Sequence, residues 1–465
     1  MLTHSVKNVL RRRLGLLKLS EGYETLVLQH FRGLCDASPS VEQVKSLLQL
    51  YVNRHYISPG QTNIDLFQRG VKCSYGPLGM ELRRNLLDQW WDSVTRSRDQ
   101  VFGVNTLSCS QDRPTQGPDL LKVVESEKLK QILDQQELSK EQLIQKVHVL
   151  LQKSASLRTN FLQGALEQFV PSLELVNRKL PFGLAETGLC FQPADGSDCK
   201  SLRLGASPAE VTQTSLVWFC SPRTSSQWLD HWARQRLKWW RKFALSPSDF
   251  SSSDIPEQEL EEVASRGVKI TYNFPWGVDT LETLWSRGDA ELLQMHNGVR
   301  SKLQCRDGRK SVPHVVSVTG NMDRGVMAFL SNSLQKLRRE DSKQRLHQRT
   351  VLKLHPVLAP VKVALDISRG ATMELRQVCE GLLLELLEAE ISAWPGYLET
   401  TPTSMEQLNA KYDEMGVLFT VVISENTLES GLLQVRSRDT TIRETMHISN
   451  IKDFLSKYIS AADNI

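Results

Sequence analysis

The chain has 465 residues, of which 40% are hydrophobic and 24% are charged, and its formal net charge is +4. This length predicts two or three domains with a sizeable core, and the sequence shows no internal repeat or low-complexity tract. The eight cysteines are scattered without a CxxC pair and no apolar run approaches 20 residues, so a disulfide framework, a metal site and a membrane span are not expected.

The first 20 residues are basic and amphipathic and contain no acidic residue. Such a segment resembles a mitochondrial transit peptide, although a basic N-terminal helix of the mature fold would have the same pattern. Its basic residues are Lys7, Arg11, Arg12, Arg13 and Lys18. Without them the net charge becomes about −1, so any nucleic-acid binding must come from local patches.

Helical spacing of apolar residues predicts helices at 41–52 and 80–95 and a helical hairpin at about 120–152. Ser139 and Gln142 have the spacing of a capping box at the start of the second hairpin helix. The hairpin can pack on its own domain or pair with a second copy as a four-helix bundle, and the pattern leaves both open. Its apolar residues, the candidate dimer contacts, are Leu129, Ile132, Leu133, Leu143, Val147 and Leu150.

A second strong helix is predicted at 228–242, followed by a mobile Ser-rich and acidic loop at 246–262. One face of this helix carries Trp228, Trp232, Gln235 and Trp239. A basic stripe beside it either tracks DNA phosphates or is the solvated side of a core helix. The stripe consists of Arg234, Lys238 and Arg241, with Lys242 next to it.

Residues 331–353 are strongly basic and are predicted to connect two domains. This segment is either a solvated linker or a surface that contacts DNA or an acidic partner. Its candidate residues are Lys336, Arg338, Arg339, Lys343, Arg345 and Arg349. No base-reading motif accompanies either basic segment, so we expect DNA contacts that are independent of sequence.

From residue 354 onward, strand and helix patterns alternate, which predicts a mainly parallel sheet covered by helices. The predicted strands are 361–367, 391–397 and 417–423, and the predicted helices are 371–390, 403–415 and 451–460.

Five segments in the correct order resemble the class II glycyl-tRNA synthetases: 74–91, 180–191, 276–292, 315–330 and 351–365. The resemblance implies an α/β (α+β) protein with an antiparallel-sheet core that contains the hairpin insertion, and a C-terminal anticodon-binding-like α/β domain. The implied domains are 21–350 and 351–465, after a transit segment at 1–20.

The departures from this family lie at the reaction centre. The resemblance places an arginine and a glutamate that handle ATP and glycine at Gln192 and Ala194, and an acid near the ATP metal at Ser317. Two further family positions are threonines, Thr280 and Thr283, whereas Glu282 and the phosphate-contacting Arg324 remain. Neither an amide nor a hydroxyl replaces these charges, so we expect no catalytic residue, cofactor or metal in this degenerate site.

The runs at 215–254, 354–365, 394–400 and 436–441 resemble the accessory subunits of mitochondrial DNA polymerase gamma. This resemblance implies a homodimeric, non-enzymatic processivity factor in the mitochondrial matrix and nucleoid. Its implied partners are the catalytic subunit of DNA polymerase gamma and double-stranded DNA, with no membrane. The alternatives are an active mitochondrial glycyl-tRNA synthetase and an inactive relative that binds tRNA.

Overall fold

The computed structural model describes residues 41–59, 74–96, 100–110, 121–135, 139–192, 209–307, 309–340, 346–368, 372–399 and 404–463. The predicted transit segment 1–20 lies outside these residues. The chain divides into two compact units, 1–47 and 48–465. Helix α3 (Val41–Asn53) confirms the helix predicted at 41–52, and all other elements belong to the second unit.

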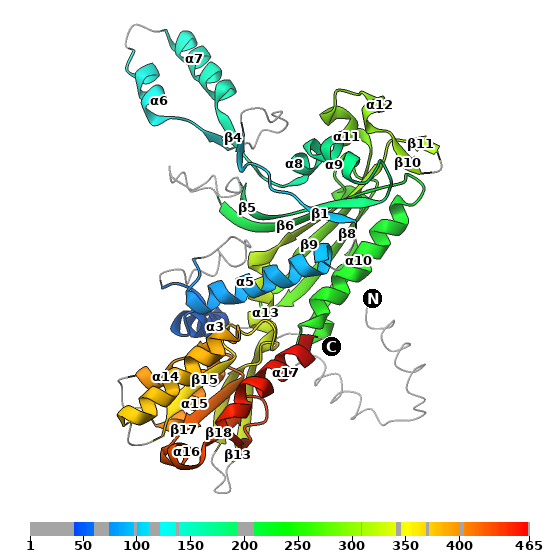
Figure 1. Ribbon diagram of the computed structural model, residues 1–465. Coiled ribbons are helices and arrows are strands. Elements are labelled where there is room, and N and C mark those ends of the chain that lie inside the picture. Colours follow the sequence, from blue (N-terminus) through cyan, green and yellow to red (C-terminus); the bar gives the residue numbers. More distant parts are fainter. Residues whose placement is uncertain are drawn as a thin grey trace, which may run out of the picture. The chain divides into compact units, whose positions relative to one another are not determined.

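A seven-stranded sheet forms the core of the first half of this unit (Figure 1). Only its first pair is parallel, and the remaining pairs are antiparallel, which confirms the predicted antiparallel-sheet core. In spatial order the strands are β1 (Val101–Gly103), β5 (Phe182–Gln192), β6 (Ala209–Cys220), β12 (His314–Asn321), β9 (Gly277–Gly288), β8 (Arg266–Phe274) and β7 (Phe250–Asp254).

The two faces of this sheet are covered by different helices. Helix α10 (Ser225–Lys242) packs on one face, where Trp218 of β6 contacts Trp228 and Trp232. On the same side, helix α13 (Met322–Ser333) packs against α10 through Phe329 and Trp240. It also contacts β6 and α5 (Pro77–Trp91), the helix predicted at 80–95.

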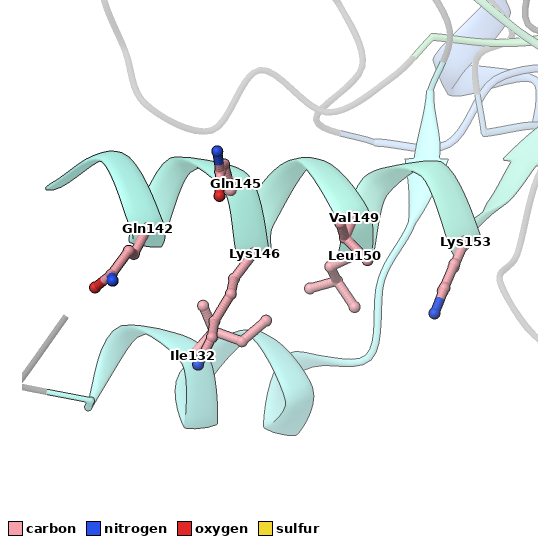
Figure 2. A pocket seen from close by; sticks show the side chains of 7 residues that line it. All are labelled: Ile132, Gln142, Gln145, Lys146, Val149, Leu150 and Lys153. Carbon is pink, nitrogen blue, oxygen red and sulfur yellow. The ribbon is translucent and has the colours of Figure 1, made fainter. Parts of the chain in front are cut away.

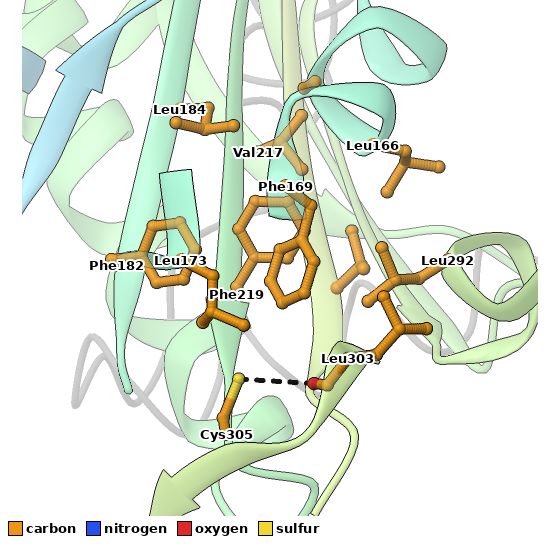
Figure 3. Close-up of a cluster of buried hydrophobic side chains, with 12 residues drawn as sticks. Leu166, Phe169, Leu173, Phe182, Leu184, Val217, Phe219, Leu292, Leu303 and Cys305 are labelled. Atoms are coloured by element: carbon orange, nitrogen blue, oxygen red, sulfur yellow. Dashed lines mark hydrogen bonds between the residues drawn. The ribbon is translucent and has the colours of Figure 1, made fainter. Parts of the chain in front are cut away.

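Alternate residues of the same strands point to the opposite face and enter a second apolar cluster. In Figure 3, Phe182 and Phe219 from the sheet lie against Phe169, with ring centroids 5.7 and 4.6 Å from that of Phe169. The helices that contribute to this cluster are α8 (Leu162–Glu167), α9 (Phe169–Leu175), α11 (Ala290–Met295) and α12 (Arg300–Leu303).

The predicted helical hairpin is present as α6 (Ser126–Leu133) and α7 (Lys140–Lys153). Ser139 and Gln142 form the predicted capping box at the start of α7. A small sheet joins the hairpin to the rest of the chain (Figure 1), and its strands are β2 (Cys109–Ser110), β4 (Ala155–Leu157) and β3 (Lys122–Val123).

The C-terminal part contains a five-stranded sheet. Three of its strands were predicted from the sequence, and these are parallel to one another. Two further strands, which the sequence pattern missed, add antiparallel pairs, so the sheet is mixed. Its strands are β16 (Ala393–Trp394), β15 (Val363–Ile367), β17 (Phe419–Ile423), β18 (Leu432–Ser437) and β19 (Arg443–His447). Its helices are α14 (Met373–Glu388), α15 (Met405–Glu414), α16 (Glu425–Ser430) and α17 (Ile451–Asp463).

Two segments that were predicted to be irregular are strands. The predicted mobile loop at 246–262 contains β7, whose Phe250 is fully buried against Trp240 and Phe329, so the loop prediction was wrong there. The predicted interdomain connection contains the antiparallel pair β13 (Leu334–Glu340) and β14 (Leu346–Leu352). Strand β14 runs through the predicted domain boundary at residue 350, and that division of the chain stays a prediction.

A buried carboxylate lies at the end of β15. Asp366 is 2% exposed, and its Oδ1 accepts a hydrogen bond of 3.2 Å from the Tyr412 hydroxyl. Its Oδ2 has no hydrogen-bond partner among the described residues. Burial raises the pKa of Asp366 to about 6, although the Tyr412 bond acts in the opposite direction. The ionised side chain is therefore destabilising in the folded state.

We expect Asp366→Asn to stabilise the chain at neutral pH. The pKa of the wild-type Asp366 carboxyl is higher in the folded state than in the unfolded state. Its contribution to stability is therefore complete below about pH 4 and is lost as pH rises through about 6. The variant should gain about 1–3 kcal/mol at pH 7.5, and this gain should shrink as pH falls toward 4. Thermal unfolding across this range measures it, with the exposed Asp453→Asn as control. A gain that does not change with pH would contradict the assignment.

Candidate functional site

Ser317 lies in the middle of β12, is 2% exposed, and takes part in an internal charged network. Its hydroxyl accepts a hydrogen bond of 2.9 Å from Nε of Arg287. The same guanidinium forms ion pairs with Glu261 at 2.6 Å and with Glu291 at 3.2 Å. The hydroxyl at the position where the resemblance implies an acid near the ATP metal thus accepts a hydrogen bond from Arg287.

Arg324, at the start of α13, is also paired within the chain. Its Nη1 lies 2.8 Å from Oδ1 of Asp279 and donates a hydrogen bond of 3.1 Å to the carbonyl of Thr280. Burial raises the pKa of Asp279, and the positive charge of Arg324 opposes this rise. Asp279 therefore lies beside Arg324, the residue to which the synthetase resemblance assigns a phosphate contact.

Of the other positions of the degenerate site, Thr280 lies beside Arg324, from whose Nη1 its carbonyl accepts a hydrogen bond. Gln192 is the last residue of β5 and is exposed, and Ala194 lies outside the described residues. Thr283 lies opposite Thr319 in the β9–β12 register. The described residues thus hold no cluster of free charges at the predicted site positions.

Glu282, which the resemblance retains, forms a buried ion pair with Arg236 of α10. Nη2 of Arg236 lies 2.8 Å from Oε1 of Glu282, and both residues are at most 2% exposed. The guanidinium also donates to the Ser93 hydroxyl at 3.1 Å and lies 4.3 Å from the ring centroid of Trp239. This pair fastens α10 to β9.

The sequence did not identify the arginine of this pair. We predicted that Gln235 shares the inward face of α10, but Gln235 is exposed and Arg236 is buried there instead. Arginine is rarely buried unless it is paired, so its partner on a distant strand was needed to place it. The sequence feature that could have placed Arg236 on the buried face of α10 was its position four residues after the buried Trp232.

The predicted basic stripe of α10 is partly free and partly used within the fold. Arg234 and Lys238 are exposed. Arg241 donates hydrogen bonds to the carbonyl of Phe250 at 2.7 and 3.0 Å, and Lys242 forms a 3.3 Å ion pair with Asp463. Two of the four candidates therefore hold neighbouring elements, and the other two are available for a partner.

The second basic segment is described only in part. Lys336 is exposed on β13, and Arg338 and Arg339 belong to the same strand. Lys343 and Arg345 lie outside the described residues. On β14, Nε of Arg349 lies 2.6 Å from Asp413, which also pairs with Arg436 at 2.9 Å, so this arginine has a structural contact.

Comparison with known proteins shows similarity to two groups. The DNA polymerase subunit gamma-2 of Mus musculus is 49% identical over 436 residues, which cover 92% of this chain and 93% of the relative. The subunit of the same name from Bos taurus is 50% identical over 428 residues, covering 91% of this chain and 87% of the relative. The chain belongs to the DNA polymerase subunit gamma-2 family.

More distant relatives of this chain are synthetases. The glycine–tRNA ligase of Thermus thermophilus is 27% identical over 328 residues, covering 65% of this chain and 63% of the ligase. A family model described as anticodon binding domain matches residues 357–458. Both resemblances inferred from the sequence, to the polymerase accessory subunits and to the glycyl-tRNA synthetases, are therefore confirmed.

The helical hairpin of this chain leaves apolar surface uncovered. Neither α6 nor α7 has a buried residue, and Ile144, Val149 and Leu151 are 38–48% exposed. Figure 2 shows the groove between the two helices, with Ile132 pointing toward α7 and Leu150 pointing toward α6. Ile144 and Leu151, which the sequence prediction omitted, extend this surface beyond the groove.

Two further findings concern the described part of the chain alone. No helix there is long and apolar enough to cross a membrane. No group of three or more His, Cys, Asp or Glu side chains has the geometry of a metal site among those residues.

Proposed function

We propose that this chain is a non-catalytic processivity subunit of the mitochondrial DNA polymerase, located in the matrix and nucleoid. The observation that carries the proposal is the 49% identity to relatives named DNA polymerase subunit gamma-2 over nearly the whole chain. In this role it binds the catalytic subunit and duplex DNA at the same time. A dissociated polymerase then rebinds DNA at a high effective concentration, which lengthens each round of synthesis.

The absence of synthetase activity is part of the proposal. Adenylation requires positioned charges around ATP, and the two charged family positions that remain, Glu282 and Arg324, are paired with Arg236 and Asp279. The alternative of a glycyl-tRNA synthetase needs Arg and Glu side chains at 192 and 194. A second alternative, an inactive tRNA-binding relative, is favoured by the anticodon-binding match at 357–458.

We further propose that the chain is a homodimer in which two hairpins form a four-helix bundle. The apolar residues of α7 lie on two adjacent sides of the helix. Leu150 points toward α6 (Figure 2), whereas Ile144 and Leu151 on the adjacent side are exposed. A helix of a four-helix bundle has two neighbours, so a second copy supplies the missing one. In that arrangement Ile144 and Leu151 become buried between copies.

The first prediction concerns chemistry. The purified chain should show no glycine-dependent ATP–pyrophosphate exchange, and Gln192→Arg alone should not restore it because Ala194 and Ser317 remain. A bacterial glycine–tRNA ligase serves as the positive control. Exchange above the buffer level would restore the synthetase alternative, and competition of tRNA against bound duplex distinguishes the tRNA-binding one.

A second prediction concerns the dimer. Ile144→Asp with Leu151→Asp should shift the mass measured by light scattering from dimer to monomer, because the charges would be buried at the interface. The fold of each copy should persist, since both side chains are already exposed. The matched control, Gln145→Asp with Gln152→Asp, adds the same charge about a quarter turn away. An unchanged dimer mass in the first variant would place the interface elsewhere.

A third prediction concerns DNA. Arg234→Glu with Lys238→Glu should weaken duplex binding and reduce the slope of log K against log salt by about 2, since each lost phosphate contact contributes about 0.9. Products of primer extension by the catalytic subunit should shorten in parallel. Arg376→Glu with Lys457→Glu makes the same charge change on the C-terminal part. If both variants bind like the wild type, α10 is not a DNA surface.

A further inference from the structure

Five basic residues from two segments far apart in the sequence lie in and around α12. We call them the α12 patch: Arg178, Lys179, Arg300, Lys302 and Arg306. None of them belongs to a basic segment identified in the sequence analysis. More than 100 residues separate 178–179 from 300–306, so no local pattern reveals the patch. A parallel β-bridge joins Lys179 to Arg306, and the Arg306 amide donates a 2.6 Å hydrogen bond to the carbonyl of Arg178.

Arg178 holds the segments of this patch together, and the other four residues form its exposed part. Its Nη1 donates hydrogen bonds to the carbonyls of Lys302 at 3.3 Å and Gln304 at 3.2 Å, which ties the turn after α9 to the end of α12. The turn has two successive residues in the left-handed region, Asn177 with φ 52° and Arg178 with φ 59°. Such conformations are unfavourable for residues other than glycine and are concentrated at functional sites.

The segment beneath the patch is anchored in the core. Leu303 and Cys305 are at most 1% exposed and belong to the cluster around Phe169 (Figure 3). Lys302 and Arg306, which flank them in the sequence, are exposed. Apolar and basic residues in this short segment therefore face opposite ways, and the cations are held on a rigid support.

The exposed cations of the patch have no carboxylate partner among the side chains that the structure describes. Lys179, Arg300, Lys302 and Arg306 are exposed, and across the residues that the structure describes none of them forms a salt bridge. Arg236, Arg287 and Arg324 all have carboxylate partners, in contrast. Four free cations close together attract a polyanion, and the gain in entropy from released counterions drives such binding.

We propose that the α12 patch binds the phosphate backbone of duplex DNA, independently of sequence. This inference rests on the proposed function and adds a second surface to it. The patch belongs to the layer around Phe169, and α10 covers the other face of the seven-stranded sheet. The two basic surfaces can therefore be tested independently, and the α12 patch contacts phosphates that α10 does not reach.

The test uses Arg300→Glu, Lys302→Glu and Arg306→Glu together in the full-length chain, with Arg178 left in place to preserve the turn. Fluorescence anisotropy with a labelled duplex is measured over a salt series. Affinity should fall at least about tenfold near 0.1 M salt, and the salt slope should decrease by about 2 to 3. The matched control carries Arg376→Glu, Arg443→Glu and Lys457→Glu, three exposed cations elsewhere, and should bind like the wild type.

A second variant, Lys302→Gln with Arg306→Gln, removes charge without reversing it and should give an intermediate loss. Wild-type affinity and slope in the triple variant overturn the proposal. Loss of binding to the catalytic subunit with unchanged duplex affinity also overturns it, because the partner would then be an acidic protein surface. If the wild-type chain itself does not bind duplex, the DNA-binding part of the proposed function fails instead.

Discussion

The buried ion pair between Arg236 and Glu282 is the interaction on which the arrangement of the first sheet depends. It links the middle of α10 to β9 with a 2.8 Å contact in a region closed to solvent. Removing one partner of such a pair costs about 3–5 kcal/mol, because the other charge stays buried. By fixing the rotation of α10 about its axis, the pair also determines that Arg234 and Lys238 face outward.

The same principle explains the degenerate site. Guanidinium groups that are partly or fully buried need anionic partners. Arg324 is paired with Asp279, and Arg287 is paired with Glu261 and Glu291 while it donates to Ser317. These internal contacts connect β9 and β12 to their neighbours within the chain itself.

Sequence patterns predicted the elements whose residues repeat a clear period. The buried strands β15 and β17 are mostly apolar, with one polar residue each, and the capping box at Ser139 marks the start of α7. Strand β7 was missed because four polar residues follow its single anchor, Phe250. The burial of Arg236 and the gathering of the α12 patch depend on partners distant in sequence, so no local pattern contains them.

The contacts of Asp413 have a consequence for cutting the chain into fragments. This carboxylate on α15 is 1% exposed and joins Arg349 of β14 to Arg436 of β18. A cut between residues 350 and 351 would divide β14, separate Arg349 from its carboxylate and expose the apolar Val351 and Leu352. An excised C-terminal fragment that keeps its native edge therefore has to begin before Leu334, so that both strands of the β13–β14 hairpin remain with it.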